Sequence, residues 1–194
     1  QAIALVKREV AFDTESEPVQ IINQGITTAN NSIYEEATQD ATKSGMGTTM
    51  VAATIFDHHM CVGNVGDSRL YVYHEGQLQQ VTQDHSVVGE MVRKGEMPKE
   101  QARNHPKRNL ITRAVGAEKE IRVDFFDETL ADGDLVLMCT DGLTSMVEEK
   151  QIEEVLASAV SLQEKTNRLV ELANDNGGKD NITVIIIEPF SDEV

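Results

Sequence analysis

The sequence is poor in cysteine, poor in positive charge and free of long apolar runs. It has two cysteines in 194 residues, and its 17 lysines and arginines against 33 aspartates and glutamates give a formal net charge of -16. Such an excess of negative charge repels phosphate backbones, so nucleic acid is not an expected partner, whereas divalent cations are. No apolar run approaches the roughly 20 residues of a membrane helix, and no signal-like segment opens the chain. We therefore expect no membrane insertion.

Both cysteines lie in apolar stretches. Cys61 falls in VAATIFDHHMCVG and Cys139 in DLVLMCTDG, and neither has a neighbouring base in the sequence. A thiol in such surroundings behaves as a small hydrophobe, so cysteine nucleophilic catalysis is disfavoured and a reducing, cytoplasmic setting fits best. Because the length allows little room for a second core, we expect a single domain over residues 1–194.

The spacing of apolar residues changes from a helical to an extended pattern along the chain. Helices are predicted over 3–10, 19–37, 152–159 and 162–170. Strands are predicted over 48–56, 121–126, 134–139 and 181–187, and three further strands over 60–65, 70–73 and 78–81 are predicted to form an antiparallel meander. The segment 84–110 differs from its surroundings, with a short helical pattern and a basic stretch. It resembles an exposed subdomain or flap.

Two aspartates stand at strand ends. Asp141 follows the predicted strand 134–139, and Asp180 immediately precedes the predicted strand 181–187, both of which are apolar enough to be buried. Carboxylates held by tight turns can present oxygen ligands to magnesium or manganese, and two such ions suit phosphoester hydrolysis. Taken singly, however, each aspartate more often serves a turn than a metal.

Other candidates are more ambiguous. Asp84 is a third acidic candidate, although it could equally cap the following helix. Asp67 is interpreted as a structural residue of a hairpin turn, and His85 is the one histidine to suspect of a functional role. The segment 45–49, GMGTT, lacks the lysine and the spacing of a phosphate-binding loop.

Six segments in order resemble successive motifs of the metal-dependent, type-2C protein phosphatases. They are SGMGTT, VGNVGDSRLYVY, VTQDHS, NLITRAVG, GDLVLMCTDGLT and GGKDNITVIII, spanning about residues 44–187. The form resembles the compact bacterial branch that is partnered with serine/threonine kinases. The resemblance implies an α+β fold, an α-β-β-α sandwich of two antiparallel sheets flanked by helix pairs. It also implies hydrolysis of phosphoserine and phosphothreonine by a two-metal hydroxide mechanism without a phosphoenzyme.

The resemblance assigns roles to particular residues. Asp141 and Asp180 match the metal-binding aspartates of the family, and Asp84 matches the ligand of a third, looser ion. Beyond these ligands, no catalytic residue is carried over. The implied cofactors are Mn²⁺ or Mg²⁺, two per site with a possible third. The stretch from Ser86 to about Arg113 matches the flap that bears on substrate choice. The implied partners are phosphorylated proteins, including a kinase and its targets.

The chain departs from the family at its start. The family begins with strands that carry an Arg, a Glu-Asp or Gln-Asp pair and an Asp-Gly-Met-Gly-Gly segment followed by His, and none of these occurs here. Gln1 falls where the first long helix should be under way. We therefore expect the chain to lack the N-terminal strands and to be inactive alone. One alternative is an inactive phosphatase-like binding or regulatory module, and another is a phosphatase for a sigma-factor regulator.

Overall fold

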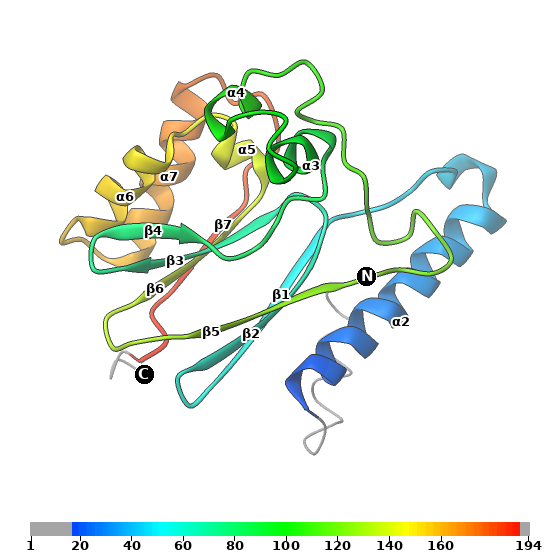
Figure 1. The fold of residues 1–194 in the computed structure, drawn as a ribbon, viewed down its shortest axis with the longest axis horizontal. Helices are drawn as coiled ribbons and strands as arrows, with labels where there is room; N and C mark the ends of the chain where they lie inside the picture. Colours follow the sequence, from blue (N-terminus) through cyan, green and yellow to red (C-terminus); the bar gives the residue numbers. More distant parts are fainter. Residues whose placement is uncertain (1–16, 191–194) are drawn as a thin grey trace. The chain divides into compact units, whose positions relative to one another are not determined.

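The chain alternates between two structural units, and each is assembled from two stretches of sequence. Residues up to Asp67 combine with Asp84–Glu128, and Ser68–Gln83 combine with residues from Thr129 onward. The computed structural model describes residues 17–190, so the helix predicted over 3–10 lies outside the described residues. Each unit has its own sheet and its own apolar core (Figure 1).

The first unit combines one long helix with a three-stranded sheet of order β1-β2-β5. Its elements are α2 (Pro18–Gln39), the 3-10 turn η1 (Ala41–Lys43), β1 (Met50–Phe56), β2 (His59–Val65), α3 (Val87–Arg93), α4 (Lys99–Ala102) and β5 (Asp124–Thr129). A two-residue turn joins β1 to β2, with positive φ at both Asp57 and His58, which is the backbone twist that antiparallel hairpins favour.

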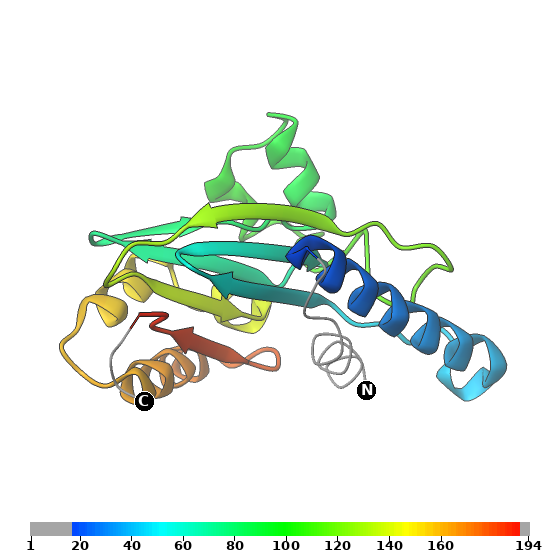
Figure 2. The same cartoon turned by 90° about the horizontal axis from the view of Figure 1, so that it is seen from below.

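Helix α2 packs on this sheet through one apolar stripe. Pro18 occupies the first turn, where its missing N–H costs nothing, and Ile22, Ile26 and Ile33 follow on one face. These side chains are buried in the same core cluster as residues of β1 and β2, and Figure 2 shows α2 beside this sheet. Each buried side chain of this size contributes about 1.5–3 kcal/mol relative to exposure. Gly63 of β2 permits the close approach, because a Cβ there would lie 2.5 Å from Ile22 Cγ2.

The second unit has a four-stranded sheet of order β4-β3-β6-β7, in which every neighbouring pair is antiparallel. Its elements are β3 (Arg69–His74), β4 (Gln77–Gln80), β6 (Leu135–Cys139), α5 (Asp141–Thr144), α6 (Glu149–Ala157), α7 (Leu162–Asp175) and β7 (Val184–Ile187). Residues of α6 and α7, including Ile152 and Leu169, share a core with Tyr71 of β3 and Leu137 of β6.

The predicted α+β class with two antiparallel sheets is confirmed, as are the helices at 19–37, 152–159 and 162–170. Ser161 caps the start of α7, since its Oγ accepts a hydrogen bond from the N–H of Glu164 at 3.2 Å. Among the described helices, none combines the length and hydropathy needed to cross a bilayer.

Two expectations about the strands are wrong. Strands β2 and β3 do not form a meander: β2 pairs with β1 and β5, whereas β3 pairs with β4 and β6. The segment Gly66-Asp67-Ser68 therefore connects two sheets and is no hairpin turn. Alternating apolar residues identify a strand but not its partner. The last strand, β7, is also not fully buried, since it lies at the edge of its sheet and Ile185 is 48% exposed.

Candidate active site

Strands β6 and β7 bring Asp141 and Asp180 to the same end of one sheet. The strands are antiparallel, and Cys139, the last residue of β6, lies opposite Val184, the first residue of β7. The segment that leaves β6 therefore runs beside the segment that enters β7. Asp141 lies two residues beyond Cys139, and Asp180 lies four residues before Val184. Sheet pairing thus places side by side two turns that are 39 positions apart in the sequence.

Thr140 holds these two turns together. Its backbone N–H donates to the carbonyl of Thr183 at 3.2 Å, and its Oγ1 accepts from the N–H of Thr183 at 3.0 Å. The same hydroxyl donates to the backbone oxygen of Asn181 at 3.1 Å. Because Thr140 directly precedes Asp141 and Asn181 directly follows Asp180, these bonds set the spacing of the two aspartates.

Gly142 makes the approach sterically possible. It is buried, and a Cβ at this position would lie 2.2 Å from the backbone oxygen of Asn181, far inside van der Waals contact. Any side chain here would push the turn of Asp141 away from that of Asp180. The Asp-Gly sequence is therefore required by a contact with a distant loop rather than by the turn alone.

The surroundings of Asp141 disfavour its charged form. Burial raises the pKa of the half-buried Asp141 above its usual range, and the negative charge of Asp180 raises it further. A hydrogen bond from the N–H of Gly142 acts in the opposite direction. Asp180 is exposed, and its Oδ1 accepts from the N–H of Asn181 at 2.7 Å. A divalent cation between the two carboxylates would relieve this repulsion.

Arg69 contributes a positive charge that acts on Asp141. It is the first residue of β3 and lies opposite Cys139 of β6, and its charge lowers the pKa of Asp141. Its Nη1 donates to the hydroxyl of the buried Tyr71 at 2.9 Å, which holds the guanidinium at the sheet end. Sequence reasoning did not identify this residue. The register of β3 against β6 is the signal that identifies it.

The donor set fits a magnesium or manganese ion better than a zinc ion. Carboxylate oxygens suit hard cations, and magnesium sites typically use one or two carboxylates and leave the remaining positions to water and substrate phosphate. Within residues 17–190, no group of three or more histidine, cysteine, aspartate or glutamate side chains is arranged to hold a metal. Asp141 and Asp180 could supply the two carboxylates of such a magnesium site.

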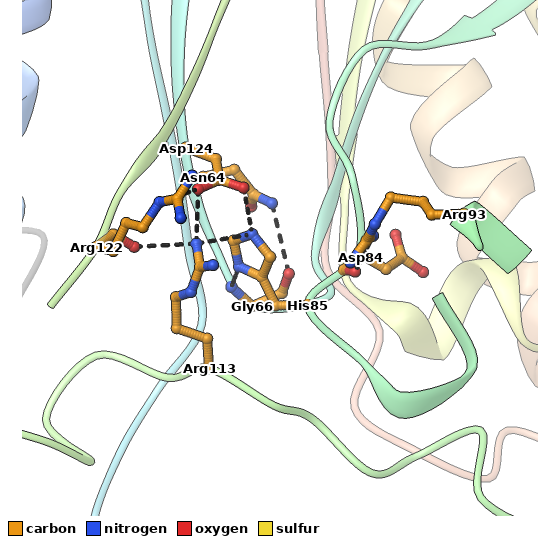
Figure 3. Close-up of polar contacts among 8 residues, drawn as sticks. All are labelled: Asn64, Gly66, Asp84, His85, Arg93, Arg113, Arg122 and Asp124. Atoms are coloured by element: carbon orange, nitrogen blue, oxygen red, sulfur yellow. Dashed lines mark hydrogen bonds and ion pairs between the residues drawn. The ribbon is translucent and has the colours of Figure 1, made fainter. Parts of the chain in front are cut away.

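Asp84 belongs to the first unit (Figure 3). It does not cap the helix that follows, because Ser86 does so: its Oγ accepts from the N–H of Gly89 at 3.0 Å. The backbone oxygen of Asp84 accepts from Nη1 of Arg93 at 2.7 Å. A Cβ on Gly89 would lie 2.8 Å from that same oxygen. The turn at Asp84 is thus packed directly on the first turn of α3.

His85 is the centre of a polar network in the same unit (Figure 3). It is 3% exposed; its Nδ1 accepts from the N–H of Gly66 at 3.0 Å and its Nε2 lies 3.0 Å from Asp124 Oδ2. Burial lowers its pKa, which favours the neutral ring. Since both nitrogens have protein partners, His85 is not placed to ligate a metal. Sequence reasoning singled out His85 but could not identify Asp124, which is 39 residues away.

The segment 86–113 is part of the first unit, and its two ends lie side by side. The N–H of Val87 donates to the carbonyl of Leu110 at 2.9 Å, and the N–H of Thr112 donates to the carbonyl of His85 at 2.8 Å. Between these ends lie α3, α4 and the basic Lys107-Arg108 pair. Leu110 exposes 52% of its surface beside that pair.

Two carboxylates at one sheet end of an α+β fold suit a metal-dependent hydrolase. Residues 2–91 match the family described as Protein phosphatase 2C. The serine/threonine phosphatase stp of Listeria welshimeri is 41% identical over 182 residues, which are 94% of this chain and 72% of that protein. The chain therefore belongs to the protein phosphatase 2C family of metal-dependent serine/threonine phosphatases.

Solved structures agree with this assignment. A bacterial serine phosphatase superposes with a TM-score of 0.90 at 35% identity, covering 100% of this chain and 79% of that one. The catalytic domain of the serine/threonine phosphatase PstP, solved in complex with two manganese ions, superposes with a TM-score of 0.83 at 29% identity, covering 95% and 79%. These relatives are phosphatases, and nothing among them supports an inactive binding module.

Proposed function

We propose that Asp141 and Asp180 hold two divalent cations, Mn²⁺ or Mg²⁺, and that Asp84 holds a third and looser one in the complete phosphatase. The observation that carries this proposal is the position of Asp141 and Asp180 at adjoining ends of β6 and β7, where burial, and after it repulsion by the charge of Asp180, raises the pKa of Asp141. Cations would offset that repulsion. The manganese ions bound by the related PstP domain support the choice of metal.

The bound ions would supply activation of water for attack on phosphorus and neutralisation of charge on the phosphoryl group. The chain's own residues keep the ligands in place for this chemistry. Thr140 and Gly142 hold the turn of Asp141 against Asn181, which limits how far the two carboxylates can move apart. Arg69 adds a positive charge that favours the ionised form of Asp141, the form that can bind a cation.

The substrates we infer are proteins phosphorylated on serine or threonine, including a kinase and the targets of that kinase. The flap, residues 86–113, carries Lys107 and Arg108 beside the exposed Leu110. Cationic side chains favour phosphopeptides, and an exposed apolar side chain adds contact area. Cys61 and Cys139 are buried and are not joined in a disulfide, which suits a reducing cytoplasmic setting.

The test is phosphatase activity of the complete protein toward a phosphothreonine peptide, with Mn²⁺ and after chelation by EDTA. Activity should disappear with EDTA and return with Mn²⁺. Activity that persists without divalent metal would overturn the proposal. Manganese calorimetry addresses the binding-module alternative, because a module without a catalytic centre need not bind the metal at all.

A further inference from the structure

His85 joins two distant segments through both its backbone and its ring (Figure 3). Its N–H donates to the carbonyl of Gly66 at 2.9 Å, while its Nδ1 accepts from the N–H of the same residue at 3.0 Å. Gly66 is therefore held at two points by one residue. Glycine is necessary at this position because φ is 111° and a Cβ would lie 2.4 Å from Cγ2 of Thr49.

The network defines the tautomer of His85. Because Nδ1 accepts a backbone hydrogen, the ring proton of the neutral form is on Nε2, which donates to Asp124 Oδ2 at 3.0 Å. Nη1 of Arg113 lies 3.0 Å from the same nitrogen, but its two hydrogens have other acceptors. They are Asp124 Oδ1 at 2.8 Å and the backbone oxygen of Arg122 at 3.1 Å. Asp124 thus receives one donor on each carboxylate oxygen.

This network holds His85, the residue next to Asp84, through both its backbone and its ring. The N–H and ring of His85 are bound to Gly66, its Nε2 to Asp124, and its carbonyl to the N–H of Thr112. Asp84, one residue earlier, has its own carbonyl bound to Arg93. These contacts fix the backbone from which the side chain of Asp84 projects, and metal ligands depend on such support from surrounding residues.

We propose that His85 is a positioning residue that orients Asp84 toward its cation by joining Gly66, Asp124 and the end of the flap in one buried network. This proposal rests on the proposed role of Asp84 as a ligand of the third ion. His85 itself neither touches a metal nor transfers a proton, because both ring nitrogens are committed to protein partners. Asp124 and Arg113 act through His85.

Single-contact variants of His85 test the proposal in the complete phosphatase. His85→Asn keeps an acceptor near the position of Nδ1 and loses the bond to Asp124. His85→Gln reaches toward Asp124 and loses the acceptor for Gly66. Each should raise the Mn²⁺ concentration for half-maximal activity about tenfold, the lower end of the loss typical when a residue supporting a ligand is changed. The KM for a phosphopeptide at saturating Mn²⁺ should stay within about twofold, because no substrate contact is removed.

Two measurements that do not depend on activity accompany these variants. Calorimetric titration with Mn²⁺ should show a matching loss of affinity in the weakest binding phase. Nitrogen NMR of the metal-free protein should show His85 as the Nε2–H tautomer. A proton on Nδ1, or unchanged Mn²⁺ affinity in both variants, would contradict the proposal.

Two control variants separate positioning from general loss of stability. His59→Asn, at the exposed start of β2, should change nothing. Ile26→Val, in the core of the same unit, should lower the melting temperature without changing the Mn²⁺ dependence. A shift in Mn²⁺ dependence with Ile26→Val would show that the effect follows stability, and the positioning role would be lost.

A double-mutant cycle decides whether His85 acts through Asp84. Asp84→Asn should itself weaken the loosest Mn²⁺ site, and adding His85→Asn should cause little further loss. If Asp84→Asn leaves Mn²⁺ binding intact, the proposed function of Asp84 fails. Suppose instead that Asp84→Asn weakens Mn²⁺ binding. If His85→Asn then has no effect in the wild type, or has the same effect in the wild type and in Asp84→Asn, only the positioning role of His85 fails.

Discussion

Gly142 lies against the backbone oxygen of Asn181, so closely that a single added methyl group would sit 2.2 Å from it. Each of these residues directly follows one of the two aspartates, Asp141 and Asp180. The contact therefore couples two turns that the sheet has already brought to one edge. It makes the separation of the two carboxylates a property of the backbone rather than of flexible side chains.

Gly142→Ala should reduce Mn²⁺ affinity and activity by about tenfold or more, because the new methyl group forces the turn of Asp141 away from Asn181. The measurements are Mn²⁺ calorimetry and peptide dephosphorylation. Gly76→Ala is the matched control: its φ of 85° makes it strained, but the Cβ meets no atom within 4 Å. It should lower the melting temperature without changing Mn²⁺ affinity. Equal Mn²⁺ effects in both variants would contradict the steric argument.

Asp141→Asn should stabilise the metal-free protein at neutral pH while abolishing the stabilisation by Mn²⁺. The folded pKa of Asp141 is raised by burial and by Asp180, so ionisation costs folding free energy as the pH rises above the unfolded carboxyl pKa. The asparagine variant avoids this cost but cannot replace a charged ligand. Activity should fall about 100-fold or more.

Thermal melts of Asp141→Asn from pH 4 to pH 8, with and without Mn²⁺, check this prediction. The difference between variant and wild type should be small at the acid end and grow as pH rises. A variant that is less stable than wild type in the absence of metal would show that Asp141 has a structural role instead.

His74 should give pH-dependent stability. Its Nδ1 lies 2.6 Å from Oδ1 of the buried Asp134, and this hydrogen bond and charge raise the pKa of His74. Protonation is therefore favoured by folding, so the stabilisation is fully present below the unfolded pKa of about 6.5 and is lost as pH rises through the folded value.

His74→Gln should thus lower the melting temperature at pH 5.5 and lower it less at pH 9. The exposed His59→Gln on β2 is the matched control and should show no such trend. A loss of stability with His74→Gln that is the same at both pH values would indicate that the charge of His74 is unimportant.

Gly63→Ala should destabilise the first unit by about 1–3 kcal/mol, since its Cβ would overlap Ile22 Cγ2 at 2.5 Å. Ile22→Ala removes that atom and costs about 2–5 kcal/mol by itself. The double variant should be more stable than the sum of the single losses predicts, because the new methyl group enters the space that Ile22 vacated. Urea denaturation measures all three, and simple additivity would refute the contact.

Some sequence expectations succeeded because they depend on local patterns. The helical spacing of apolar residues identified α2 over 19–37 and α7 over 162–170. Strand β5 begins three residues later than predicted, at Asp124, because an apolar pattern does not show where pairing starts. The pairing of β2 and β3 in one meander failed for a related reason. Consecutive strands pair often but not always, and local alternation contains no information about the partner.

The sequence by itself determined that Asp141 and Asp180 stand at strand ends, and its ordered motifs determined the family. The spacing of apolar residues and the residue types in turns reflect local structure within a few positions, so they can be interpreted without knowing the fold. Only the tertiary structure decided that Thr140 and Gly142 hold Asp141 against Asn181, and that His85 meets Asp124. Those contacts join segments about 40 residues apart, and they exist because strand pairing and core packing, which depend on the whole chain, bring the segments together.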